Sequence, residues 1–231
     1  MKLNTLDIAR MIDISLVKSN NSYADFDSII ESAKKYRFVC VFALSSHIPY
    51  IRDGLAGEKD ILIGCPVGFP SGSETTATKV FQARECLKMG CDEIDMVINL
   101  GWLVSGKYKE VKDDINAVIE AAGDMKVKVI IETMLLTDDE IKRAAEIVAG
   151  TEAYYIKTGT GWQAQTTTYH HIEVIKEAIG DSKKIKASGG IRTLGQFLGF
   201  YKMGIRRMGI GYRAAMEIIR ESEKYSQGID I

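Results

Sequence analysis

Short apolar runs alternate with amphipathic segments along almost the whole chain. Eight of the runs have the length and the β-branched content of strands. They lie at Ile12–Val17, Phe38–Leu44, Asp60–Val67, Glu93–Asn99, Lys126–Thr133, Ala153–Lys157, Lys184–Ser188 and Arg207–Gly211. The run Phe38–Leu44 is apolar throughout, which is typical of a strand buried on both faces.

Segments with helical spacing lie between nearly all of these runs. They are predicted at 3–11, Tyr23–Lys35, Thr76–Met89, Lys107–Ala122, Asp138–Ala149, about Thr167–Gly180, Leu194–Met203 and from Arg213 onward. The stretch His47–Gly57 is expected to be a helix or a loop.

This regular alternation predicts an α/β fold with a parallel sheet and right-handed crossovers. Eight such units in 231 residues favour a closed (β/α)8 TIM barrel, in a single domain, over an open sheet. No Gly-x-Gly-x-x-Gly motif follows the first strand, so a dinucleotide-binding fold has little support. The polar C-terminal tail, 221–231, is expected either to be disordered or to fold over the mouth of the barrel.

Composition narrows the class of protein. The net charge of −1 shows no excess of basic residues of the kind that binds nucleic acid. No apolar run reaches the ~18 residues of a membrane span. The N-terminus lacks the apolar core of a signal peptide. The four cysteines show no disulfide spacing, so a reduced, cytoplasmic protein is expected. Cys86 and Cys91 have no histidine nearby, which argues against a zinc site, so no bound metal is expected.

Three predicted strands carry a charge where the interior of a barrel would be. If Asp95 points inward, its neighbours of the same parity do too, while the alternate apolar residues pack under helices. Lys157 ends one predicted strand and Lys186 lies within the next one. Neighbouring strands of a sheet are roughly 4.8 Å apart. Lys184 lies at the start of its strand, away from the mouth where barrels place their chemistry.

Two neighbouring ammonium groups change each other's chemistry. At about 5–6 Å and an effective dielectric near 20 they repel by roughly 3 kcal/mol, on the order of two pKa units. Desolvation acts in the same direction. One lysine is therefore expected to be neutral often enough to attack a carbonyl and form a Schiff base, while Asp95 shuttles protons. The alternative is a purely structural ion-pair network, but two buried cations against one anion would stabilise a fold poorly.

Glycine-rich corners follow the last three predicted strands, at 158–161, 188–193 and 209–211. Glycines let backbone N–H groups approach an anion, and helix N-termini add a favourable dipole. Barrels commonly hold phosphate at their last two loops. These corners, beside the two lysines, predict a phosphate site.

Several segments together resemble one family. They are Asp92–Asn99, Lys128–Thr133, Tyr155–Gly161, Lys186–Thr193 and Gly68-Phe69-Pro70. Over almost its whole length the chain resembles the deoxyribose-phosphate aldolases, which are (β/α)8 class I aldolases that need no metal or organic cofactor. The resemblance implies reversible cleavage of 2-deoxy-D-ribose 5-phosphate to acetaldehyde and D-glyceraldehyde 3-phosphate. Its partners would be these small molecules, with no nucleic acid or membrane, and the assembly a homodimer.

The resemblance also implies roles for individual residues. Lys157 would form the Schiff base, Lys186 would tune its pKa and Asp95 would relay protons. Asp13 and Cys40 would line the substrate pocket. The remaining candidates for substrate binding are Thr158, Thr160, Gly161, Gly189, Gly190, Gly209, Gly211 and Arg213.

The chain departs from the family at two strands. The first usually reads Asp-His-Thr and here reads Asp13-Ile14-Ser15, and the last usually ends Gly-x-Ser-Ser, where this chain has Gly211-Tyr212. The lost hydroxyls leave open a second hypothesis, that the same machinery acts on another sugar phosphate or on an unphosphorylated aldehyde. A third, a catalytically idle barrel with a binding role, is disfavoured by the intact trio of lysines and aspartate.

Overall fold

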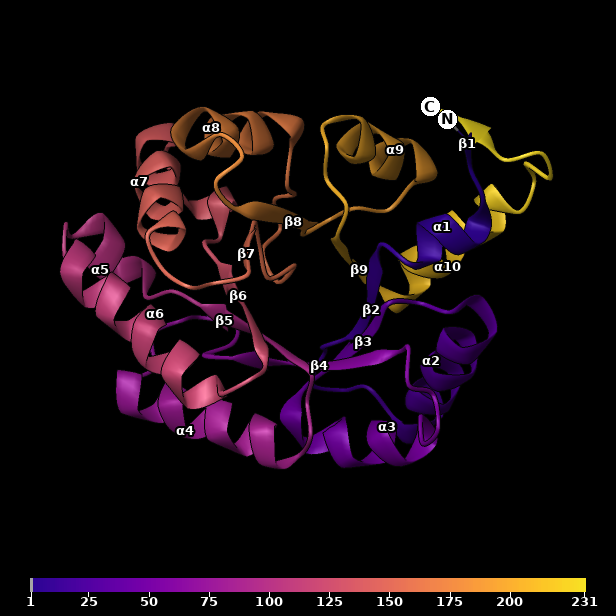
Figure 1. Ribbon diagram of the computed structural model, residues 1–231, viewed down its shortest axis with the longest axis horizontal. Helices are drawn as coiled ribbons and strands as arrows, with labels where there is room; N and C mark the ends of the chain where they lie inside the picture. The colour runs from indigo at the N-terminus through magenta and orange to yellow at the C-terminus, as the bar shows by residue number, and fades with distance from the viewer. Residues whose placement is uncertain (1) are drawn as a thin grey trace.

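The computed structural model describes residues 2–231. Eight parallel strands close into a barrel in chain order, and helices surround it (Figure 1). The barrel strands are β2 (Ile12–Leu16), β3 (Cys40–Ala43), β4 (Leu62–Val67), β5 (Glu93–Val97), β6 (Lys126–Ile130), β7 (Tyr155–Lys157), β8 (Lys184–Ser188) and β9 (Met208–Gly211). The predicted (β/α)8 barrel in a single domain is confirmed.

The helices follow the strands in the predicted order. They are α2 (Tyr23–Tyr36), α3 (Ile48–Gly54), α4 (Thr76–Lys88), α5 (Leu100–Val104), α6 (Tyr108–Ala122), α7 (Asp138–Ala149), α8 (Tyr169–Ile179), α9 (Leu194–Lys202) and α10 (Tyr212–Ser222). Local side-chain bonds fix several starts: Thr137 and Glu140 form a capping box at α7, and Thr193 and Gln196 form another at α9. Short 3₁₀ turns lie at Ser45–His47 and Thr133–Leu135.

Two segments differ from the sequence-based expectation. The predicted helix at 3–11 is a two-residue strand, β1 (Lys2–Leu3), followed by α1 (Thr5–Ala9). The break occurs because Asn4 forms a capping box with Asp7 and so starts the helix later. Helix α5 was not predicted; Asn99 caps it by accepting a hydrogen bond from the backbone N–H of Trp102 at 3.0 Å.

The C-terminal tail neither covers the mouth nor lies free. Its strand β10 (Ile229–Asp230) pairs antiparallel with β1, and Ser222 at the end of α10 donates a hydrogen bond to Thr5. The two termini therefore meet beside α1, which leads into the amino-terminal end of β2 (Figure 1). The carboxyl ends of the barrel strands remain open to a ligand.

The apolar core lies between the strands and the ring of helices. Residues of one parity, such as Ile94 and Met96 of β5, are completely buried there. Residues of the other parity fill the barrel interior, and several of them are charged and equally buried, including Asp95 and Lys128. Within residues 2–231, no helix is both long and apolar enough to cross a membrane.

Candidate active site

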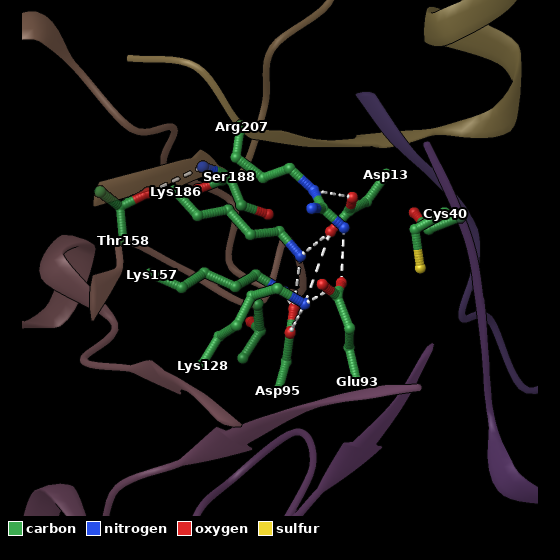
Figure 2. Close-up of polar contacts among 12 residues, drawn as sticks. Asp13, Cys40, Glu93, Asp95, Lys128, Lys157, Thr158, Lys186, Ser188 and Arg207 are labelled. Atoms are coloured by element: carbon green, nitrogen blue, oxygen red, sulfur yellow. Dashed lines mark hydrogen bonds and ion pairs between the residues drawn. The ribbon is translucent and has the colours of Figure 1, made fainter. Parts of the chain in front are cut away.

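Seven charged side chains meet inside the barrel and form what we call the inner network. They are Asp13 of β2, Glu93 and Asp95 of β5, Lys128 of β6, Lys157 of β7, Lys186 of β8 and Arg207 just before β9. All are at most 7% exposed. Figure 2 shows them converging from strands around the barrel.

Asp95 is the centre of this network. Its Oδ2 accepts hydrogen bonds from Nζ of Lys157 at 2.8 Å and from Nζ of Lys186 at 2.6 Å. Its Oδ1 accepts one from Nζ of Lys128 at 3.0 Å. The strand register produces this arrangement, since Lys157 pairs with Lys186 and Asp95 pairs with Lys128. The sequence-derived trio is therefore brought together, and its two lysines share one oxygen.

The deeper part of the network was missed by the sequence analysis. Lys128 Nζ lies 2.7 Å from a Glu93 oxygen, and the Arg207 guanidinium pairs with both Glu93 and Asp13. Asp13 also pairs with Lys186. The expected two cations against one anion are in fact four cations against three carboxylates. If Lys157 loses its proton, the formal charges of the network balance.

Burial and charge shift the pKa values of the network in opposite directions. Burial, with repulsion from Lys186 added, lowers the pKa of Lys157 to about 8, against the attraction of Asp95. Burial would also lower the pKa of Lys128, but the carboxylates around it, led by Asp95, raise it instead. For Asp95 the three ammonium groups outweigh burial and hold its pKa well below the ordinary value. Lys157 is thus the lysine of this network that is poised to be neutral near physiological pH.

A cavity lies above the network at the carboxyl ends of the strands. Its inner part is lined by Lys157 and Lys186 together with Asp13, Phe42 and Pro66. It continues through Ser15, Thr160, Ser188 and Gly209 into an outer cavity of about 880 Å³. Lys157 therefore lies at the inner end of a cavity whose outer part opens to solvent.

The aromatic ring of Phe42 closes one side of the inner cavity. Its centroid lies 4.7 Å from Nζ of Lys186 and 5.6 Å from Nζ of Lys157. The facing residue on β4 is Gly64, where a Cβ would come within 2.1 Å of the ring. The absence of a side chain at Gly64 therefore lets an apolar wall stand beside the lysines and keep water from them.

Most of the predicted substrate-binding residues line the outer cavity. They are Thr160, Gly161, Gly189, Gly190, Gly209, Gly211 and Arg213. Trp162 lines it too and stacks edge-on against Phe69. Lys18 and Arg192 add two further cations to the wall, and neither was singled out from the sequence. Lys18 lies in the loop after β2, which carries no recognisable motif.

Two of the predicted pocket residues lie elsewhere. The Thr158 hydroxyl is buried, donates to the Ser188 carbonyl at 2.8 Å and accepts from the Ser188 N–H, so it joins β7 to β8 and does not line the cavity. Cys40 pairs with Asp13 in register and lies one inward position below Phe42, outside the cavity lining. Burial raises the pKa of its thiol well above the ordinary value.

A buried glutamate holds the loop beside Lys157. Glu132 follows β6 with a left-handed backbone, φ +52°, and its carboxylate accepts hydrogen bonds from Thr160, at 3.0 Å from the backbone N–H and 2.5 Å from the hydroxyl. Such strained conformations persist where surrounding structure enforces them, often at functional sites. Glu132 belongs to one of the segments that resemble the family, but the direction of its side chain cannot be read from the sequence pattern.

One set of potential metal ligands lies within the network, at Asp13, Cys40 and Glu93. Both carboxylates are already paired with Arg207. The guanidinium therefore occupies the place that a cation would take.

The fold and the lysine-lined cavity define the chain as a (β/α)8 barrel of the aldolase type. The family described as DeoC/LacD family aldolase matches residues 11–210. The chain is 39% identical to the deoxyribose-phosphate aldolase of Staphylococcus carnosus (strain TM300) over 221 residues, 96% of this chain and 99% of the relative. It is also 39% identical to the deoxyribose-phosphate aldolase of Rhizobium meliloti (strain 1021) over 215 residues, 93% of this chain and 87% of the relative. The chain therefore belongs to the DeoC/LacD family of aldolases.

Solved structures have the same fold. The aldolase QR15 is 29% identical and superposes with a TM-score of 0.89, covering 96% of this chain and 98% of its own. A deoxyribose-phosphate aldolase from Aeropyrum pernix, 23% identical, superposes with a TM-score of 0.82 over 95% of this chain and 92% of its own. At this lower identity the likeness concerns the barrel alone.

Proposed function

We propose that the protein is a class I aldolase that reversibly cleaves 2-deoxy-D-ribose 5-phosphate to acetaldehyde and D-glyceraldehyde 3-phosphate. The observation that carries this proposal is the shared oxygen: Lys157 and Lys186 both donate to Oδ2 of Asp95 at the floor of a cavity. The relatives named deoxyribose-phosphate aldolase support the choice of substrate.

The neutral Nζ of Lys157 attacks the C1 aldehyde of the open-chain sugar. Loss of water from the carbinolamine gives a protonated imine, which withdraws electrons from the C2–C3 bond. A base removes the proton of the C3 hydroxyl as that bond breaks, and the electron pair passes into an enamine on C1 and C2. D-Glyceraldehyde 3-phosphate then leaves.

The enamine takes a proton at C2, and water hydrolyses the resulting imine to acetaldehyde and free Lys157. Asp95 relays protons between these positions, directly or through water, because it contacts both Lys157 and Lys186. The cation of Lys186 favours the neutral form of Lys157 before attack. The deeper residues Lys128, Glu93 and Arg207 hold Asp95 and Asp13 in place.

The phosphate of the substrate would lie in the outer cavity. Three cations, Lys18, Arg192 and Arg213, line this space, and α10 begins at its edge with Tyr212. Backbone N–H groups at glycine corners and at a helix N-terminus favour an anion. Cations here supply charge where Gly211 and Tyr212 replace the two serines, and so the two serine hydroxyls, of the family pattern.

A second candidate keeps the Schiff base but changes the substrate to another sugar phosphate or to an unphosphorylated aldehyde. It is favoured by Tyr212, whose hydroxyl lies 3.4 Å from Ser32 of α2 and is thereby engaged away from the glycine corners. Comparing kcat/KM for deoxyribose 5-phosphate with that for deoxyribose distinguishes the two candidates. Equal values would favour the second.

The third hypothesis, an idle barrel, makes a separate prediction. Borohydride reduction in the presence of acetaldehyde would leave no adduct on Lys157, whereas the aldolase gives one there. The free thiols of all four cysteines support a reducing compartment such as the cytoplasm.

A homodimer is the expected assembly, and sedimentation velocity tests it.

A further inference from the structure

Three of the four cysteines form a compact group on the outer side of the barrel. The Sγ atoms of Cys65, Cys86 and Cys91 all lie within 4.8 Å of one another. All three residues are buried and none forms a disulfide. This thiol cluster lies away from the inner network, because Cys65 has the opposite parity on β4 to Pro66, which lines the catalytic cavity.

The end of helix α4 brings two of these cysteines together. Gly90 has φ +75°, the N–H of Gly90 donates to the Leu87 carbonyl, and the N–H of Cys91 donates to the Cys86 carbonyl at 3.1 Å. This pattern is the Schellman motif, in which the side chains at the positions of Cys86 and Cys91 contact each other. Cys65 of β4 completes the cluster from beneath the helix. The sequence pattern argues against a zinc site because the spacing of Cys86 and Cys91 alone does not show this third sulfur.

The spacing of the three sulfurs suits a metal ion better than a disulfide. A zinc–sulfur bond of ~2.3 Å in the tetrahedral geometry that zinc prefers places three sulfurs about 3.8 Å apart and leaves the fourth position to a solvent molecule. A disulfide would require two of the three to approach to about 2 Å and would leave the third unused.

The site also has a route from solvent. Cys91 is 6% exposed at the turn between α4 and β5. The exposed side chain of Arg52 lies over the adjacent Gly90 and donates a hydrogen bond to the Met89 carbonyl at 2.7 Å. The Arg52 side chain is therefore the group that an ion entering at this turn would have to pass.

We propose that Cys65, Cys86 and Cys91 form a structural binding site for a thiophilic divalent metal ion of the zinc and cadmium type. Each of the three thiols releases its proton to solvent as it becomes a ligand, so three thiolates around the dication leave the loaded site with a net charge of −1. The site is independent of the aldolase reaction proposed above.

Cadmium alone is the probe, added to the full-length reduced protein. We expect one tightly bound cadmium per chain, with a thiolate-to-cadmium absorption band, and a raised melting temperature. Cys86→Ser should weaken binding by at least about tenfold. Cys40→Ser is the matched control, because Cys40 is also buried and free but lies inside the barrel, and it should retain the band.

Several results would overturn the proposal. They are the absence of the band in the wild-type protein, its survival in Cys86→Ser, and its loss in Cys40→Ser. Sulfur counting by X-ray absorption on the cadmium-loaded wild-type protein needs no variant. A shell of three sulfurs around the cadmium supports the site. A shell dominated by oxygen or nitrogen would show that the three cysteines serve only as buried core residues.

Discussion

Lys157 and Lys186 occupy paired positions on β7 and β8 and donate hydrogen bonds to the same carboxylate oxygen. Their ammonium groups can therefore be no further apart than the sum of two hydrogen-bond lengths. Repulsion at this distance adds to burial, and the pKa of Lys157 falls to about 8 from 10.5.

Lys186→Leu should remove the repulsion and raise the pKa of Lys157. The acidic limb of the profile of kcat/KM against pH should then move to higher pH, and turnover at pH 7 should fall by roughly a hundredfold or more. Lys184→Leu is the matched control, because Lys184 lies at the exposed start of the same strand. A Lys186→Leu protein with near wild-type turnover at pH 7 would contradict the role assigned to this cation.

Gly64→Ala should force the Phe42 ring out of its place beside the lysines. We expect a loss of roughly 1–3 kcal/mol in the free energy of unfolding, as for other overpacked cores, and lower turnover. Gly195→Ala in α9 is the control, because a Cβ there meets nothing closer than 3.9 Å. Denaturant titration of both variants measures the difference, and equal stabilities would show that the ring moves without cost.

Glu132→Gln should loosen the loop that Thr160 fixes beside the Schiff-base lysine. Gln has only one carbonyl oxygen to accept the two hydrogen bonds from Thr160. We therefore expect KM to rise several-fold, which corresponds to a loss of about 1 kcal/mol in the free energy of substrate binding. Borohydride trapping of acetaldehyde should persist, because Lys157 is untouched.

Thr160→Val removes the hydroxyl that donates a hydrogen bond to the Glu132 carboxylate, so it breaks the same contact by changing the donor. If Glu132 acts through Thr160, the double variant should be no worse than the more impaired single variant. Additive losses of kcat/KM would show that the two residues act separately.

Arg213→Gln should selectively weaken the phosphorylated substrate. A hydrogen bond to a charged group contributes about 1.5–3 kcal/mol, so KM for deoxyribose 5-phosphate should rise roughly tenfold or more. The value for deoxyribose should not change. Arg220→Gln on the same helix is the control, because Arg220 pairs with Glu217 on the exposed face. Parallel changes with both substrates would place the phosphate elsewhere.

Side-chain parity explains how far the sequence could predict this site. Alternation within β5 correctly placed Asp95 inward, and the barrel order made Lys157 and Lys186 neighbours. The same alternation places Glu93 and Lys128 inward, but Glu93 is the first residue of its strand and Lys128 the middle one, so neither lies at the carboxyl end where chemistry is expected. Their contribution becomes visible only when the depth of each residue in the barrel is known.

Motif matching predicts which residues are near the site but not which way they point. Thr158 belongs to a segment that matches the family, yet its hydroxyl forms hydrogen bonds with the backbone of Ser188 in β8 and does not face the cavity. Cys40 matches a pocket position but lies below the ring of Phe42. Lys18 shows the reverse case, since it lines the outer cavity from a loop with no distinguishing pattern. Side-chain direction and loop path depend on tertiary contacts that a single sequence does not display.

Borohydride trapping with acetaldehyde, followed by mass spectrometry across a range of pH, tests the central claim most directly. We predict a single reduced adduct on Lys157, formed at a rate that rises with pH and levels off above a pKa of about 8. An adduct on another lysine, or a rate that keeps rising toward the ordinary lysine value of 10.5, would contradict the account.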